Sequence, residues 1–129
     1  MSMNPVVHFE MPAQNMERMV KFYKELFGWD VQVLGPEMGG YGLATTTPTD
    51  KNGPTKPGAI NGGFYTKSKK SNQHPSIVIE VEDIHKHIEK ITAAGGKVFG
   101  KVDEVPGMGL FASFVDSEGN TVGLWQNLK

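Results

Sequence analysis

The sequence contains no cysteine among its 129 residues. Disulfide bonds, thiolate metal ligands and a cysteine nucleophile are therefore all excluded, and we expect a cytoplasmic protein. An excess of charge of either sign is also missing, because 13 basic and 14 acidic residues leave a formal net charge of −1. Non-specific binding to nucleic acid or to an anionic membrane depends on a strong positive charge, so we expect neither as a partner.

Long apolar runs are absent as well. No segment approaches the roughly 20 consecutive apolar residues that span a bilayer, and the polar N-terminus lacks the apolar centre of a signal peptide. The length suits one domain. Glycine, in contrast, is abundant: the chain has 16 glycines, well above the average share of about 7%.

Hydrophobic periodicity divides the chain into two similar halves. In the first, apolar and polar residues alternate over 6–11, which predicts a strand with Val7 and Phe9 facing the core. Asn15 is a predicted N-cap, a helical apolar stripe follows it, and Gly28 is a predicted helix stop. Three more strands are predicted, over residues 29–34, 41–46 and 59–66, with turns and a loop at 35–40 and 47–58.

The second half repeats this order. A strand is predicted over 76–81, with Ile77 and Ile79 on the core side, followed by the N-cap Asp83 and a helix that ends at Gly95-Gly96. A shift of 68 residues superimposes Asn15 on Asp83 and Gly28 on Gly96. Three strands follow, over residues 97–102, 110–115 and 121–126. The prediction is an α+β fold of two βαβββ modules, over about 3–66 and 74–127, joined by a linker over 67–73.

Two local sequences indicate a family. The run His8-Phe9-Glu10-Met11-Pro12-Ala13 and the closing run Asp116-Ser117-Glu118-Gly119-Asn120-Thr121-Val122-Gly123-Leu124-Trp125 resemble the vicinal oxygen chelate superfamily. That superfamily includes glyoxalase I, bleomycin-resistance proteins, fosfomycin-resistance proteins and extradiol dioxygenases. The ending Gly-Leu-Trp-Gln is most similar to its uncharacterised glyoxalase-like branch. The resemblance implies curved mixed sheets around a cup, helices on the outside, and a homodimer.

The same resemblance implies where a metal would bind. Metal-dependent members carry His, Gln or Glu on the first and last strand of each module, and His8 falls on the first of these positions. Ser76 and Gly123 occupy two others, and Asn61 or Gly62 the remaining one, so the usual set of four ligands is incomplete. We therefore expect no cofactor and doubt glyoxalase I activity.

A shifted metal site is the alternative. His74 has the same strand parity as Ser76 and lies about 7 Å earlier along the strand. A set of His8, His74 and a carboxylate would make the protein a metal-dependent lyase, isomerase or dioxygenase.

A metal-free site also follows from the residues on the cup face. His8, Glu10 and Glu80 are the candidate acid–base residues, because burial of an unpaired carboxyl raises its pKa toward the working range of a general base. Trp125 supplies an aromatic wall, and Gly62, Gly63 and Gly123 are expected to leave space beside it. The residues predicted to line the ligand site are Asn61, Gly63, Ser76, Val78, Gly123 and Trp125.

The predicted function is a small-molecule-binding protein or a metal-independent enzyme of unknown substrate. A drug-sequestering resistance protein is a third possibility, since it resembles the first structurally but catalyses nothing. Simpler interpretations remain open: Glu10 and Glu80 as solvent-facing charges, and Trp125 as a residue that closes the barrel mouth or a dimer seam.

Overall fold

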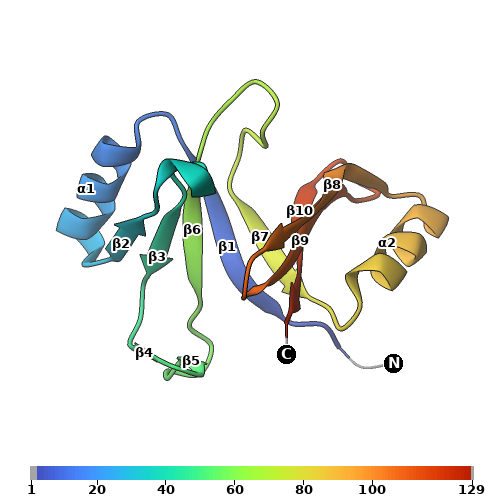
Figure 1. The fold of residues 1–129 in the computed structure, drawn as a ribbon, viewed down its shortest axis with the longest axis horizontal. Helices are drawn as coiled ribbons and strands as arrows, with labels where there is room; N and C mark the ends of the chain where they lie inside the picture. Colours follow the sequence, from blue (N-terminus) through green and yellow to red (C-terminus); the bar gives the residue numbers. More distant parts are fainter. Residues whose placement is uncertain (1–2, 129) are drawn as a thin grey trace. The chain divides into compact units, whose positions relative to one another are not determined.

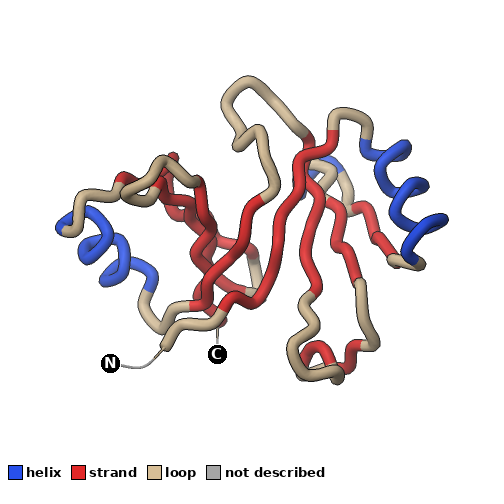
Figure 2. Tube along the Cα trace, turned by 180° about the vertical axis from the view of Figure 1, so that it is seen from behind, coloured by secondary structure: helices blue, strands red, loops and turns tan. Residues whose placement is uncertain are grey.

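A computed structural model describes residues 3–128 (Figure 1; Figure 2). These residues form two compact units. The N-terminal unit comprises residues 8–75, and the C-terminal unit comprises residues 76–128 together with 3–7. Each unit holds one α-helix and four strands of a mixed sheet, which confirms the predicted α+β fold. Neither helix within residues 3–128 is long and apolar enough to cross a membrane.

In the N-terminal unit the chain runs strand, helix, strand, strand, strand. Its main elements are β1 (Val6–Ala13), α1 (Met16–Phe27), β2 (Asp30–Val33), β3 (Gly42–Thr45) and β6 (Asn61–Thr66). The strand order is β2-β3-β6-β1; β2, β3 and β6 are antiparallel, whereas β1 pairs parallel with β6.

Two of the predicted connections contain short regular elements. A 3-10 helix, η1 (Pro36–Met38), lies in the first, and a hairpin of β4 (Thr49–Asp50) and β5 (Gly53–Pro54) lies in the second. These connections were predicted as turns and loop only. Elements of two or three residues are too short for an apolar repeat, so periodicity does not reveal them.

The C-terminal unit repeats this architecture. Its elements are β7 (Ser76–Glu80), α2 (Ile84–Ala93), β8 (Lys97–Val105), β9 (Gly109–Val115) and β10 (Thr121–Asn127). The strand order is β8-β9-β10-β7, again with only the first strand parallel to its neighbour. β8 extends beyond the predicted residue 102, because its pairing with β9 resumes after a register shift between Phe99 and Asp103.

The two units bury equivalent residues. Met11 of β1 pairs with Phe64 of β6, and Ile79 of β7 pairs with Leu124 of β10. Phe64 is 0% exposed and Leu124 is 2% exposed. Leu124 belongs to the core of its unit, against which α2 packs through Ile84. The predicted duplication is therefore visible in strand order, in register and in the buried residues.

α1 covers its sheet through an aromatic cluster. The Tyr23 ring stacks on Trp29 with centroids 4.7 Å apart, and Tyr23 and Phe64 have centroids 5.6 Å apart. The ring centroids of Phe9 and Trp29 are 5.5 Å apart, and Trp29 stacks on Tyr23 of α1. Phe9 therefore faces the helix, as predicted. Ile77 differs from its prediction, because it is 42% exposed. The core of the C-terminal unit includes Ile79, farther along β7, but does not include Ile77.

Both helices begin and end at polar or glycine signals. The Asn15 side chain accepts a hydrogen bond from the backbone N–H of Arg18 at 3.0 Å, and Asp83 accepts from that of Lys86 at 3.1 Å. Gly28 ends α1 in the left-handed conformation, with φ of 71°. Only glycine adopts this conformation without strain, so the predicted N-caps and the stop at Gly28 are confirmed.

We predict that Asn15→Ala and Asp83→Ala each lower the free energy of unfolding by about 1 kcal/mol. Each substitution leaves a helix-terminal N–H without its side-chain acceptor. Urea unfolding followed by circular dichroism measures the effect. Gln14→Ala is the control, since Gln14 is exposed and lies outside the helix. Equal stability of Asn15→Ala and the control would contradict the capping role.

Candidate functional site

The clearest polar site within one unit centres on Glu10. Phe9 faces α1, so its neighbour Glu10 points to the opposite side of the sheet. We call this side the polar face of the N-terminal sheet; it carries Glu10, Gly63 and Tyr65. Tyr41, the residue before β3, donates a hydrogen bond from its hydroxyl to Oε2 of Glu10 at 2.8 Å.

Gly63 makes this contact possible. Gly63 of β6 lies opposite Glu10 of β1 and opposite Leu43 of β3, so it sits between the strand that carries Glu10 and the strand that follows Tyr41. A Cβ atom at Gly63 would overlap the hydroxyl group and ring of Tyr41. The Tyr41 ring therefore lies over a bare stretch of backbone, and any larger residue at 63 would displace it from Glu10.

The space predicted beside the strand glycines is filled by protein rings. A Cβ at Gly62 would lie 2.6 Å from the Phe9 ring, and at Gly123 it would lie 3.0 Å from the Phe111 ring. Tyr41 takes the corresponding space at Gly63. The glycines accommodate neighbouring aromatic side chains, so the expectation that they leave room for a ligand is corrected. Register and side-chain direction, which sequence does not show, decide this.

Burial makes the Glu10 carboxyl a weaker acid than an exposed one. Desolvation raises the pKa of the Glu10 carboxyl above its usual value, and the hydrogen bond from Tyr41 opposes this effect less strongly. Burial, and then the nearby Glu10 charge, raise the pKa of Tyr41 well above its usual range. Burial and the Glu10 charge also raise the pKa of Tyr65 to about 12. Glu10 is thus the group of this cluster that exchanges a proton most easily.

Tyr65 is held at the edge of this cluster. Its hydroxyl donates a hydrogen bond to the backbone carbonyl of Asn72 at 2.6 Å. The segment that follows β6 is itself ordered by hydrogen bonds, since the Gln73 side-chain amide donates to the carbonyl oxygen of Ser68 at 2.6 Å. Tyr65 is therefore fixed by the connection between the two modules, close enough to Glu10 to feel its charge.

Asn61, a predicted ligand-binding residue, has a structural role. Its Oδ1 accepts a hydrogen bond from the backbone N–H of Thr46, and its Nδ2 donates to Oγ1 of Thr49, both at 2.8 Å. The amide thus holds the segment between β3 and β4. His8 lies opposite Asn61 in the β1–β6 register and on the same face as Glu10.

The C-terminal unit contains a second polar arrangement, built around Glu80. Trp125 lies opposite Glu80 in the parallel β7–β10 pair. The Trp125 indole N–H donates to Oδ1 of Asn127 at 2.6 Å, and Nδ2 of Asn127 donates to Oε1 of Glu80 at 2.9 Å. A Cβ at Gly109 would overlap both the backbone carbonyl oxygen of Gln126 and the Trp125 indole, so this glycine leaves space for the ring and for the neighbouring backbone.

Three further predicted residues lie on β7 and β10. Val78 is 2% exposed and lies opposite Gly123. Ser76 begins β7 and is half-buried. Val78 thus packs beside Gly123, where an added Cβ would lie 3.1 Å from its side chain.

The side chains present do not match a divalent-metal site. Within residues 3–128, no three His, Asp or Glu side chains gather closely enough to hold a metal ion. The donor chemistry agrees with this finding. Ser76 and Gly123 offer neither charge nor imidazole, and the amide of Asn61 is engaged with Thr46 and Thr49. His74 sits in an exposed turn, where its backbone N–H donates to Asn72.

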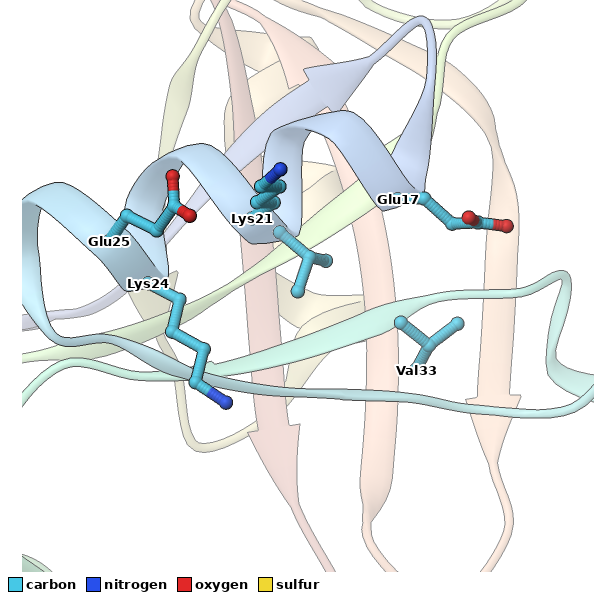
Figure 3. A pocket seen from close by; sticks show the side chains of 6 residues that line it. Glu17, Lys21, Lys24, Glu25 and Val33 are labelled. Atoms are coloured by element: carbon cyan, nitrogen blue, oxygen red, sulfur yellow. The ribbon is translucent and has the colours of Figure 1, made fainter.

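An open hollow of about 610 Å³ lies between α1 and β2 (Figure 3). Its lining residues are Glu17, Val20, Lys21, Lys24, Glu25 and Val33. It lies beside the helix, whereas Glu10 lies on the other side of the sheet. This hollow is therefore separate from the Glu10 cluster.

The model of the Glyoxalase/Bleomycin resistance protein/Dioxygenase superfamily matches residues 6–124. The chain belongs to this superfamily. A relative from Didymella fabae, a glyoxylase-like domain-containing protein, is 35% identical over 117 residues, which cover 87% of this chain and 85% of that protein. The family suggested by the sequence is therefore confirmed.

Solved structures of the superfamily share the fold. A superfamily member from Vibrio splendidus has a TM-score of 0.63 at 11% identity, covering 98% of this chain and 100% of its own. Methylmalonyl-CoA epimerase from Mycobacterium tuberculosis has a TM-score of 0.66 at 10% identity, covering 96% and 88%. A trihydroxybiphenyl dioxygenase from Sphingomonas wittichii has a TM-score of 0.61 at 17% identity, covering 99% of this chain and 42% of the dioxygenase.

The sequence pattern does not reveal the hydrogen-bonding partners of the two carboxyls, which are Tyr41 for Glu10 and Asn127 for Glu80. Tyr41 and Glu10 are 31 residues apart, and Asn127 and Glu80 are 47 apart. Only the strand register brings such residues together, so no local signal identifies them. A tyrosine and a glycine on neighbouring predicted strands is a weak hint at most.

We predict that Gly63→Ala lowers the free energy of unfolding by about 1–3 kcal/mol, because the added methyl group displaces the Tyr41 ring. In a Tyr41→Ala background the same change should cost little, since the space is then empty. Urea unfolding of the four variants measures this coupling. Gly123→Ala, where the nearest ring atom is 3.0 Å away, is the matched control and should cost less. Equal costs of Gly63→Ala with and without Tyr41 would contradict the contact.

We also predict that Glu10→Gln is more stable than the wild type at pH 7 but not at pH 4. Because burial raises the pKa of Glu10 in the folded state, the protonated carboxyl contributes stability at low pH. That contribution is lost as the pH rises through the folded-state value. Glutamine stays neutral and still accepts the Tyr41 hydrogen bond. Urea unfolding between pH 4 and pH 7 measures the difference, and a less stable Glu10→Gln at pH 7 would contradict it.

Proposed function

We propose that this chain binds a small organic molecule at the polar face of its N-terminal sheet. Glu10 exchanges a proton with that molecule without the help of a metal. The observation that supports the proposal is the half-buried Glu10 carboxyl held by Tyr41 at 2.8 Å. A carboxyl whose pKa is raised by burial comes closer to the pH at which it works as both acid and base.

The two Glu10 oxygens have different roles in this proposal. Tyr41 binds Oε2 and orients the carboxyl, which leaves Oε1 for the ligand. Tyr41 keeps its proton, because its pKa is raised far above neutral pH. It is therefore a hydrogen-bond donor that positions Glu10, and Glu10 is the group that gains and loses the proton.

The chemistry that suits this pair is proton transfer at a carbon beside a carbonyl group. The ionised Glu10 removes the proton from carbon, the electron pair of that bond moves to the carbonyl oxygen as an enolate, and Glu10 returns the proton. No oxidant or metal is needed for the proton balance. Methylmalonyl-CoA epimerase, a protein of the same fold, is by name an epimerase, and a carbon centre of this kind is inverted when the proton leaves one face of the enolate and returns to the other. At 10% identity this likeness supports the fold only.

His8, two residues before Glu10 on the same face, is a second candidate for proton transfer. Glu80 and Trp125 are proposed to offer a polar and an aromatic contact on the sheet of the C-terminal unit. The cysteine-free composition fits a cytoplasmic protein, and superfamily resemblance implies a homodimer.

The proposal predicts that a ligand found by thermal-shift screening exchanges a C–H proton in D₂O when this protein is present. The screen uses small carboxylates, thioesters and ring-bearing acids, and proton NMR follows the exchange. Glu10→Gln should slow the exchange by at least about 100-fold, the usual contribution of general acid–base catalysis. Tyr41→Phe should slow it less, because it loosens Glu10 without removing it. Glu104→Gln, an exposed carboxyl of the other unit, is the control.

Three results would contradict the proposal. Undiminished exchange in Glu10→Gln would place the chemistry elsewhere. Tight binding with no exchange would favour a sequestering protein. Stoichiometric metal in protein purified without a histidine tag, offered Ni, Zn, Mn or Fe and lost in His8→Ala, would favour the metal-dependent alternative.

A further inference from the structure

The helix α1 carries a second apolar stripe that its own sheet does not cover. Phe22 is 52% exposed and Leu26 is 61% exposed, and Met19 beside them is half-buried. No residue of α1 is fully buried. This stripe is distinct from the side of the helix on which Tyr23 packs against Phe64 and Trp29.

The spacing of the stripe is that of a helix–helix seam. Met19, Phe22 and Leu26 follow one another at intervals of three and four residues. This alternation places them along one line of the helix, as the a and d positions of a coiled coil are placed. A single helix that exposes such a line is typical of one that packs against a second helix.

The charges beside the stripe are complementary to those of a second copy of the same helix. Arg18 and Glu25 are seven residues apart, so both flank the stripe on the same side. In an antiparallel pair that places Met19 opposite Phe22 of the second copy, Arg18 of each helix meets Glu25 of the other. Two identical ion pairs then enclose the apolar contact.

The other simple arrangements lack this match. A parallel pair places Arg18 of one helix beside Tyr23 of the other and Glu25 beyond the end of the second helix, so neither charge meets its complement. The antiparallel register shifted toward Leu26 brings the two Glu25 carboxylates together. The charges therefore select one two-fold register, as e and g residues select partners in coiled coils.

We propose that α1 is a self-association surface on which a second copy of this chain packs antiparallel through Met19, Phe22 and Leu26. This surface is independent of the ligand chemistry at Glu10. Glu17, Lys21, Lys24 and Glu25 line the hollow beside the helix, so Glu25 borders both the hollow and the stripe, whereas Glu17, Lys21 and Lys24 lie outside the seam (Figure 3). A 12-residue helix offers less area than the 1,200–2,000 Å² of a standard stable interface, so the dimer depends on protein concentration.

The test is sedimentation equilibrium of the full chain from about 1 µM to 1 mM, a range that covers weak interfaces of this size. Phe22→Ser should weaken association by at least about tenfold, because it removes the central apolar contact. Arg18→Glu and Glu25→Arg should each weaken it about tenfold, since each places like charges opposite one another. The double variant Arg18→Glu/Glu25→Arg should restore association to about the wild-type level, because it rebuilds both ion pairs with reversed sign.

A loss of association in the charge variants is not expected to reflect unfolding. Glutamate in the first turn and arginine in the last turn both interact favourably with the helix dipole, so the charge variants should remain folded. Circular dichroism verifies this, and Lys21→Glu, outside the seam, should leave association unchanged. A chain that stays monomeric up to 1 mM overturns the proposal. So does a dimer that is insensitive to Phe22→Ser or is not restored by the double variant.

Discussion

The parallel pairing of the first strand of each unit with its last strand is the constraint on which the rest of the structure depends. β1 lies beside β6, and β7 lies beside β10. Parallel neighbours require a crossover, and the α-helix that follows each first strand begins that return path. This pairing places large apolar residues, Phe64 and Leu124, at the centre of each unit, where they are nearly inaccessible to solvent. It also sets the register that brings Glu10 opposite Gly63.

The strand register explains why glycine occupies particular positions in these strands. A strand glycine weakens a sheet unless another group uses the space, and here aromatic rings do so. Gly63 admits Tyr41 and Gly109 admits Trp125, and each ring then reaches a polar partner through its hydroxyl or N–H group. The lack of a side chain at each glycine thus leaves the space in which an aromatic ring is held. The same principle appears in both units with different residues, which gives each unit its own polar arrangement on one scaffold.

The two repeated units differ chemically because corresponding strand positions carry different residues. Glu10 of the first unit corresponds in register to Val78 of the second, since Glu10 lies opposite Gly63 and Val78 lies opposite Gly123. The first unit therefore carries a half-buried carboxyl where the second carries a buried valine. By the same correspondence, Tyr65 matches Trp125. A duplicated fold keeps its core residues while its surface positions acquire separate roles.

The sequence by itself determined the repeated order of elements, the helix caps and the superfamily, because these depend on local periodicity, on single capping residues and on short motifs. It also identified Glu10 as a candidate, since strand parity places that residue away from the core. Only the tertiary structure decided what surrounds Glu10. Tyr41 reaches it from another strand, and Gly63 provides the space between them. Contacts between residues so far apart depend on register and on side-chain direction, and neither is written in the local pattern of residues.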